Sequence, residues 1–179
     1  MLSRTLNRTD YRGWVRVLGI ALFAVATAIS ARLSVLTPLS PVPLTMQVMV
    51  VLASGLLLGP RDGFIAQLVY LQAVLLGAPA TASGLIGPAA FAGPTAGYLI
   101  AFPLAALVAG WFGQRASARL AWRALGALLG VAVIYALGTA WLAVYLGGMA
   151  QAVRAGVLPF VVADALKAVI AVGIVSTRR

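Results

Sequence analysis

The chain has 179 residues, of which 63% are hydrophobic and only 9% are charged. Soluble domains carry about 25% charged residues, so this composition excludes an ordinary soluble domain and indicates an integral membrane protein. The sequence contains no Cys, no His and no Glu, which removes the usual zinc and di-iron sites and leaves few general acid–base groups. We expect no metal and no cofactor, and we do not expect an enzyme, since a lipid-modifying enzyme would have to work with Asp, Lys, Tyr and Ser.

The N-terminal segment, residues 1–13, is polar and basic. Its arginines recur every four residues and continue into the first span, which places them along one stripe of a helix. Such a stripe is typical either of a short amphipathic helix on an anionic membrane surface or of a charged flank that sets topology. The first span is predicted over residues 14–33 and contains Ala24 and Ala28, a small-xxx-small pair that lets another helix approach closely.

A proline-rich segment, residues 34–43, follows the first span. Pro38, Pro41 and Pro43 rule out a helix and predict an extended, stiff segment. The segment is too apolar for an ordinary solvated loop, so we expect a lid or wall over a cavity, with a plain connector as the alternative. The second span is predicted over residues 44–58.

Residues 59–63 read as a tight polar turn before a third span over residues 64–76. Gln67, Tyr70 and Gln72 lie in this span, and we expect all three to find partners in the bundle interior or a wet cavity. Residues 77–97 are rich in Gly and Pro, lack charge and predict a long irregular segment. Such backbone is tolerated at membrane depth only inside protein or along a cavity, where its amides could bind a neutral polar ligand.

Three further spans are predicted over residues 95–111, 124–146 and 158–176, with a loop over 147–157. The sequence therefore predicts an all-α integral membrane bundle of six transmembrane helices, forming one domain over residues 14–179.

The last span carries two charged residues in an otherwise apolar stretch. Asp164 is one of three acids in the chain and Lys167 is the only lysine. They stand three residues apart, on one face of a helix, and either charge costs about 2.5–3.5 kcal/mol at mid-membrane. A self-neutralising pair that fixes helix packing is the alternative; we interpret the pair as the floor of a ligand site.

The distribution of arginines sets the orientation of the six spans. The side with both termini collects ten basic residues: Arg4, Arg8, Arg12, Arg16, Arg61, Arg115, Arg119, Arg123, Arg178 and Arg179. The other side has Arg32 and Arg154. The positive-inside rule places both termini in the cytoplasm, which explains the net charge of +10 without a nucleic-acid partner.

This orientation puts the loops 34–43, 77–94 and 147–157 outside, above the charged pair. Asp164 is expected about 9 Å and Lys167 about 14 Å below the outer end of the last span. We expect an outward-opening pocket for a small, mostly apolar acid with an amide-like head. Its candidate polar contacts are Gln47, Thr95 and Tyr98, and its candidate apolar walls are Trp141, Tyr145 and the loop prolines.

Several motifs occur in a characteristic order: S-P-V-P-L-T-M-Q at 40–47, L-L-L-G-P at 56–60, Y-L at 70–71 with G-A-P at 77–79, G-P-T-A-G-Y-L-I-A-F-P at 93–103 and D-A-L-K at 164–167. Through these motifs the chain resembles the BioY family, the biotin-binding S components of energy-coupling factor (ECF) transporters, over nearly its whole length. Each motif alone is weak, whereas the combination is specific.

The resemblance implies an ECF S-component-like six-helix fold and high-affinity capture of biotin from the outer side. It implies that Asp164 and Lys167 are essential for binding and that Gln47 and Tyr98 lie near the ligand. We interpret Lys167 as the partner of the valerate carboxylate and Asp164 as the acceptor for the ureido N–H groups. Two departures are that many relatives have G-x-P-V-F where this chain has G-A-P-A-T at 77–81, and that a basic residue common in the 77–97 region is missing.

The resemblance also implies partners in a prokaryotic cell membrane. Ala24 and Ala28 would face a transmembrane coupling (T) subunit, which joins two ATP-binding subunits. The chain itself has no nucleotide-binding motif. Some family members are proposed to act alone or as homo-oligomers.

Three other functions are weighed against this one. One alternative is a stand-alone secondary transporter or facilitator, for biotin or another small carboxylic acid. It would need a relay of ionisable residues for a coupling ion, and one intramembrane Asp is little for such a relay. A membrane enzyme would lack the usual His, Glu and Cys. A structural membrane anchor is the third.

Overall fold

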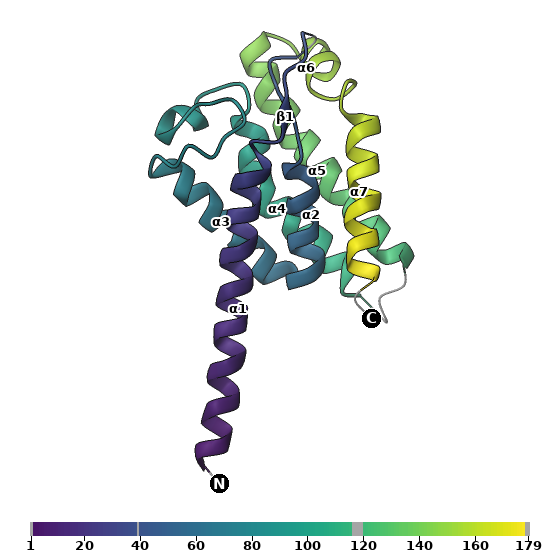
Figure 1. Cartoon of the computed structure of the whole chain (residues 1–179). Helices are drawn as coiled ribbons and strands as arrows, with labels where there is room; N and C mark the ends of the chain where they lie inside the picture. Colours follow the sequence, from purple (N-terminus) through teal and green to yellow (C-terminus); the bar gives the residue numbers. More distant parts are fainter. Residues whose placement is uncertain (1, 39, 116–119, 178–179) are drawn as a thin grey trace.

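The computed structural model describes residues 2–38, 40–115 and 120–177. These residues form an all-α bundle with one minimal hairpin (Figure 1), which confirms the predicted fold class. In chain order the elements are α1 (Leu2–Ser30), β1 (Ser34–Val35), β2 (Leu44–Thr45), α2 (Gln47–Leu58), α3 (Pro60–Leu75), the 3-10 helix η1 (Gly87–Phe91), α4 (Ala96–Gly113), α5 (Leu120–Leu146), α6 (Met149–Gly156) and α7 (Val161–Ser176).

The long helices differ in how well each could cross a membrane alone. Within the described residues α1, over Gly13–Ser30, α4 and α5 are long and apolar enough, and α6 with α7 makes a fourth span bent by 54°. The 12 residues of α2 reach only about 18 Å, against a hydrocarbon core of about 30 Å. A short helix is tolerated here because α2 packs against α1, α3, α4, α5 and α7, and those neighbours screen it from lipid.

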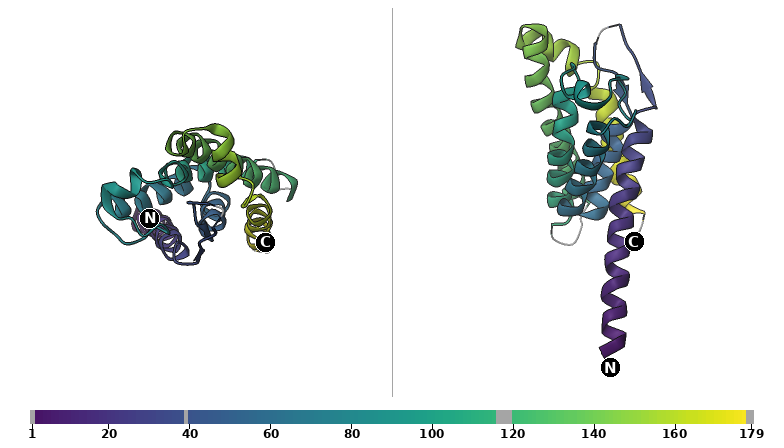
Figure 2. Two further views of the ribbon diagram at one scale, coloured as in Figure 1. Left: turned by 90° about the horizontal axis from the view of Figure 1, so that it is seen from above. Right: turned by 90° about the vertical axis from the view of Figure 1, so that its left-hand side faces the viewer.

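The two ends of the bundle have different structures. The hairpin, the Gly-rich segment and α6 gather at one end, and the C-terminus lies at the other (Figure 1). The N-terminal part of α1 extends beyond the bundle at that second end, as Figure 1 and the right panel of Figure 2 show. The elements that sequence analysis assigned to the outer face are therefore on the same side of the molecule.

The Pro-rich segment contains no helix in its described residues, as predicted, but only Ser34 and Val35 form a strand, and that strand belongs to a hairpin that was not predicted. Ser34 pairs with Thr45 and Val35 with Leu44 in antiparallel register. Because Leu44 and Thr45 belong to β2, helix α2 begins at Gln47, three residues later than the predicted second span.

Four other predicted boundaries were wrong. The polar turn before the third span is shorter than expected, because Pro60 occupies the first turn of α3, where its missing N–H costs nothing. The expected loop 147–157 contains helix α6. Residues 157–160 then form turns, so α7 begins at Val161, and α5 begins four residues before its predicted start.

Glycines bring α2, α3 and α4 into backbone contact. A Cβ on Gly55 would lie 2.0 Å from the carbonyl oxygen of Ala106, and one on Gly63 would lie 2.7 Å from the Cα of Gly55. A Cβ on Gly110 would lie 2.6 Å from the oxygen of Gly55. The three helices therefore cross closely at the end of the bundle opposite the hairpin.

Buried polar side chains tie α1, α2 and α3 together. Thr27 Oγ1 donates to Gln67 Oε1 at 3.2 Å, and Gln67 Nε2 donates to Ser54 Oγ at 3.1 Å. All three side chains are inaccessible. The prediction of interior partners holds for Gln67 and Tyr70 but is wrong for Gln72, which is exposed near the end of α3.

Ala24 and Ala28 pack inside the chain. Ala24 is 7% exposed in the core, and Ala28 is partly buried against that core. Their small side chains let α1 approach its own bundle. The expectation that this pair faces a partner subunit stays a prediction. The outward surface of α1 carries larger apolar residues instead: Leu18, Leu22, Val25 and Ile29.

Candidate functional site: a cavity floored by a buried ion pair

A cavity opens beneath the hairpin end of the bundle and draws residues from five segments of the chain: 42–48, 81–83, 95–102, 134–135 and 160–167. Its volume is about 60 Å³. The floor and walls are Gln47, Val48, Thr95, Tyr98, Leu99, Phe102, Ile134, Tyr135, Phe160, Asp164 and Lys167, and the roof is Val42, Pro43, Leu44, Thr45, Thr81, Ala82 and Ser83. Five of the six predicted ligand contacts are in this set.

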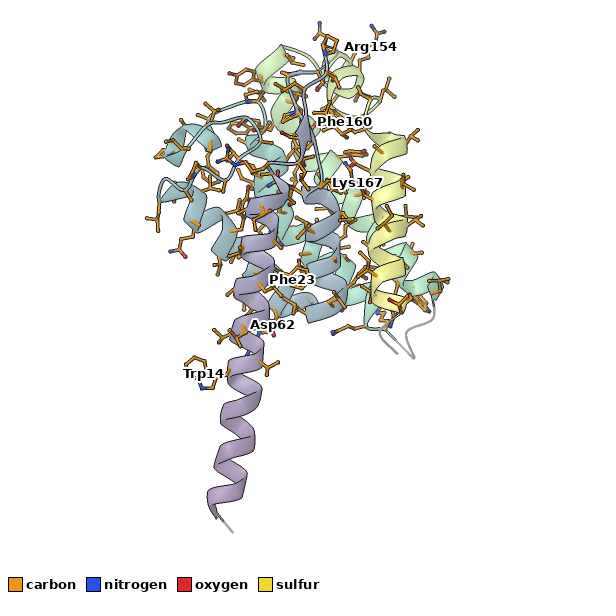
Figure 3. All side chains as sticks on the ribbon, viewed as in Figure 1. Trp14, Phe23, Asp62, Arg154, Phe160 and Lys167 are labelled. Carbon is orange, nitrogen blue, oxygen red and sulfur yellow. The ribbon has the colours of Figure 1, made fainter. Side chains whose placement is uncertain are left out.

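The floor holds both charged residues of α7. Lys167 Nζ donates to Asp164 Oδ1 at 2.8 Å, and their side chains are only 7% and 5% exposed. Lys167 and Phe160 both lie toward the hairpin end, below Arg154 (Figure 3). The pair therefore faces a cavity within the protein, as the sequence predicts, and its two members also neutralise each other.

Asp164 is closer to the outer end of α7 than expected. It lies in the first turn of the helix, because α7 begins at Val161. At 1.5 Å per residue, Asp164 is only about 5 Å and Lys167 about 9 Å along the helix axis. A carboxylate in the first turn is stabilised by the positive end of the helix dipole, which offsets part of the cost of burying it.

Tyr135 is a cavity residue that sequence reasoning missed. It comes from α5, and its hydroxyl donates to Asp164 Oδ2 at 2.8 Å. Both carboxylate oxygens of Asp164 therefore have a donor, one from α7 and one from α5. A lone tyrosine in an apolar span carries no signal that it faces a charge on another helix.

Gln47 occupies the first turn of α2 and is 3% exposed. Its Nε2 donates to the hydroxyl of Tyr70 at 2.8 Å, and that hydroxyl donates to the carbonyl oxygen of Ala80 at 3.0 Å. In the described part of the chain no donor reaches Gln47 Oε1. This amide oxygen is therefore free to accept from a ligand, while Tyr70 anchors the Gly-rich roof segment to α3.

Tyr98 and Thr95 lie at the start of α4, and both line the cavity. The hydroxyl of Tyr98 donates to the carbonyl oxygen of Gly156 at 2.9 Å, and a Cβ on Gly156 would lie 2.1 Å from that hydroxyl. Tyr98 thus ties α4 to the end of α6 and closes the cavity on that side. Its oxygen can still accept one hydrogen bond.

Trp141, the sixth predicted contact, is not among the cavity-lining residues. Its indole N–H donates to the carbonyl oxygen of Gly93 at 2.9 Å. A Cβ added to Gly97 would lie 2.4 Å from the Cβ of Trp141. Trp141 holds the segment before α4 against α5. Tyr145, the other expected aromatic wall, is 56% exposed and lies outside the cavity.

The chemistry of the floor follows from its charges and hydrogen bonds. Asp164 and Lys167 cancel in net charge, while the ammonium keeps donors beyond the one used by Asp164. The carboxylate oxygens and Gln47 Oε1 keep acceptor positions. Such a floor favours a neutral ligand group in which a carbonyl stands beside N–H groups. No cluster of three or more His, Cys, Asp or Glu side chains occurs within the described ranges, so a metal would have few ligands here.

Comparisons with known proteins agree with this architecture. A crystal structure of the S component for biotin from an ECF-type ABC transporter superposes with a TM-score of 0.87 and 27% sequence identity, covering 94% of this chain and 92% of that one. A probable biotin transporter BioY from Pyrococcus horikoshii is 44% identical over 153 residues, covering 86% of this chain and 89% of that protein.

The biotin transporter BioY from Thermotoga maritima is 35% identical over 150 residues, covering 84% of this chain and 87% of that protein. The model of the BioY family matches residues 5–179. Because this match and both alignments span most of its length, the chain belongs to the BioY family.

Proposed function

We propose that this chain captures biotin from the outer side of a prokaryotic cell membrane and delivers it inward as the substrate-binding subunit of an ATP-driven ECF transporter. The observation that carries the proposal is the buried Asp164–Lys167 pair, which lines a cavity at the hairpin end instead of being sealed in helix packing. The names of the relatives and of the superposed S component point to the same vitamin.

The charged floor fits the ureido ring of biotin better than its carboxylate. Asp164 already neutralises Lys167 at 2.8 Å, so a second carboxylate there would leave a net negative charge in a buried site. A ureido group offers a carbonyl to Lys167 and N–H groups to Asp164 and Gln47. The valerate carboxylate would then point to the roof, where the hydroxyl of Ser83 lies. This revises the interpretation of Lys167 as the carboxylate partner.

A cycle that changes ligand and protein together tests this orientation. Affinity is measured for biotin and biotin methyl ester, with the wild-type chain and with Lys167→Met. If Lys167 binds the ureido carbonyl, the ester loses the same factor in both proteins, and Lys167→Met weakens both ligands. A loss on esterification that disappears in Lys167→Met would instead place the carboxylate on Lys167. Val162→Ala, 82% exposed on the same helix, is the matched control.

Energy for uptake would come from partner subunits. The chain has no phosphate-binding loop, so a T subunit and two ATP-binding subunits would couple ATP hydrolysis to transport. The outward surface of α1, with Leu18, Leu22, Val25 and Ile29 between 55% and 66% exposed, is the contact surface we propose for the T subunit. This surface is adjacent to Ala24, which is buried, and Ala28, which is partly buried against the core.

The alternative is a chain that transports biotin alone or as a homo-oligomer. Uptake into proteoliposomes separates the two proposals. The subunit proposal expects binding without accumulation when the chain is reconstituted alone, and ATP-dependent accumulation when the T and ATP-binding subunits are added. Accumulation by the chain alone would favour the stand-alone transporter.

A further inference from the structure

Tyr135 contacts the charged floor from a different helix than the one that carries the charges. Its hydroxyl on α5 donates to Asp164 Oδ2 at 2.8 Å, while Lys167 on α7 donates to Oδ1 at 2.8 Å. The side chains of Asp164 and Lys167 are only 5% and 7% exposed. The carboxylate is thus held between two donors on either side, and its plane is fixed before any ligand enters.

This arrangement determines which hydrogen bonds remain for a ligand. Each carboxylate oxygen has two lone-pair positions, and one on each oxygen is taken. An ammonium has three protons, and Asp164 is the acceptor for one of them in the described part of the chain. The floor therefore offers a ligand one acceptor position on each oxygen of Asp164 and the remaining N–H donors of Lys167. The pair itself has no net charge.

Two ligand heads of the same shape would meet this floor differently. A cyclic urea supplies a carbonyl for the ammonium of Lys167 and N–H groups for the carboxylate. A cyclic guanidinium has no carbonyl, brings a positive charge close to Lys167, and would need both oxygens of Asp164 for its preferred two-point contact. In that contact Oδ2 would accept from the guanidinium and from the hydroxyl of Tyr135 at once, which weakens the bond to the guanidinium.

We propose that Tyr135 is a specificity-determining residue, which holds Asp164 so that the cavity accepts a neutral urea head and rejects a cationic guanidinium of the same shape. The proposal rests on the proposed function, because it concerns how biotin is distinguished from charged analogues. Tyr135 acts on the ligand through Asp164 and is in that sense a positioning residue.

Tyr135→Phe tests the proposal, since it removes the hydroxyl and keeps the ring. Affinity is measured for biotin and for 2-iminobiotin, in which a protonated guanidine replaces the urea. Loss of a hydrogen bond to a charged group predicts about a tenfold or greater loss in biotin affinity. Because Oδ2 then accepts from the guanidinium alone, the ratio of biotin to 2-iminobiotin affinity should fall by about tenfold or more. Tyr145→Phe, on the same helix but 56% exposed, should leave both affinities unchanged.

The outcomes separate this proposal from the proposed function. If wild-type protein binds biotin and Tyr135→Phe leaves the ratio unchanged, Tyr135 only packs, and the specificity role is overturned. If wild-type protein does not bind biotin, the proposed function fails instead. Should Tyr135→Phe lower the unfolding temperature enough to prevent binding measurements, Tyr135→Met, which also lacks the hydroxyl, gives the same ratio test.

Discussion

Asp164 and Lys167 are buried together at the cavity floor, and each makes the other tolerable in a low-dielectric environment. Removing one member of such a pair leaves a buried charge without its counter-ion, which costs about 3–5 kcal/mol. Replacing both by uncharged groups of similar size removes that cost. The stability of the protein and its binding of biotin should therefore respond differently to single and double substitutions.

We expect Lys167→Met and Asp164→Asn each to lower the unfolding temperature, and the double variant to be more stable than either. All three should bind biotin at least about tenfold more weakly, because each loses hydrogen bonds to a charged group. Thermal unfolding in detergent and equilibrium binding measure the two effects. A double variant destabilised by the sum of the two single losses would show that the charges are not coupled.

The sequence predicted some of the cavity residues and missed others. Asp164 and Lys167 were predictable because charge in an apolar stretch is costly and needs a reason. Gln47, Thr95 and Tyr98 were placed correctly in the cavity. Tyr135 was missed, since recognising it requires knowing which face of α5 meets α7.

Helix packing in this chain depends on where glycine is placed. Gly55 lies where a Cβ would meet the backbone of Ala106 at 2.0 Å, whereas a Cβ on Gly173 would meet nothing within 4 Å. Both glycines are inside helices, so both pay the same loss of helix propensity relative to alanine. The two positions form a matched pair for separating packing from propensity.

We expect Gly55→Ala to destabilise the bundle by about 1–3 kcal/mol or more, because the added methyl group pushes α2 away from α4. Gly173→Ala should be neutral or stabilise it by about 0.5–1 kcal/mol. Denaturation of the purified variants measures both changes. Equal effects at the two positions would mean that the close crossing of α2 and α4 does not contribute to stability.

Elements with a strong hydrophobic signal were predicted well, and short elements were not. The long spans follow from composition alone. Helix α6 was expected as a loop because Gly147 and Gly148 precede it and its residues are mixed in polarity. Strands β1 and β2 pair only because the fold brings residues 34–35 and 44–45 together. Strands of two residues are too short to show a strand pattern in the sequence. Small residues at 24 and 28 indicate close packing but do not identify the partner.

The whole molecule separates a basic end from an end that holds the cavity. Arg61, Arg115 and Arg123 belong to the end with the C-terminus, and Arg154 lies at the hairpin end (Figure 3). The positive-inside rule then favours cytoplasmic termini and a cavity that faces outward. This orientation is required if biotin is captured from outside the cell.

Cysteine labelling tests the orientation directly, since the chain contains no cysteine. The Gln151→Cys variant on α6 should react with a membrane-impermeant maleimide in intact cells. The Thr177→Cys variant, after the end of α7, should react only once the membrane is permeabilised. Both positions are exposed, so accessibility within the protein does not limit either reaction. The reverse pattern would place the cavity on the cytoplasmic side.

The cavity volume of about 60 Å³ is well below the roughly 300–1,000 Å³ of most small-molecule sites. We therefore expect the roof, residues 42–45 and 81–83, to move outward when a vitamin binds, while the floor stays in place. The floor lies on packed helices, whereas the roof is the hairpin end and an irregular segment. The division matches a rigid recognition surface with an adjustable cover.

Equilibrium binding of labelled biotin to the purified chain, without partner subunits, is the most direct measurement. Saturable binding of one biotin per chain is expected, displaced by unlabelled biotin, retained in Val162→Ala and weakened at least about tenfold in Lys167→Met and Asp164→Asn. Absence of saturable binding by the folded wild-type chain, or full binding by both charge variants, would contradict a biotin site built on the buried pair.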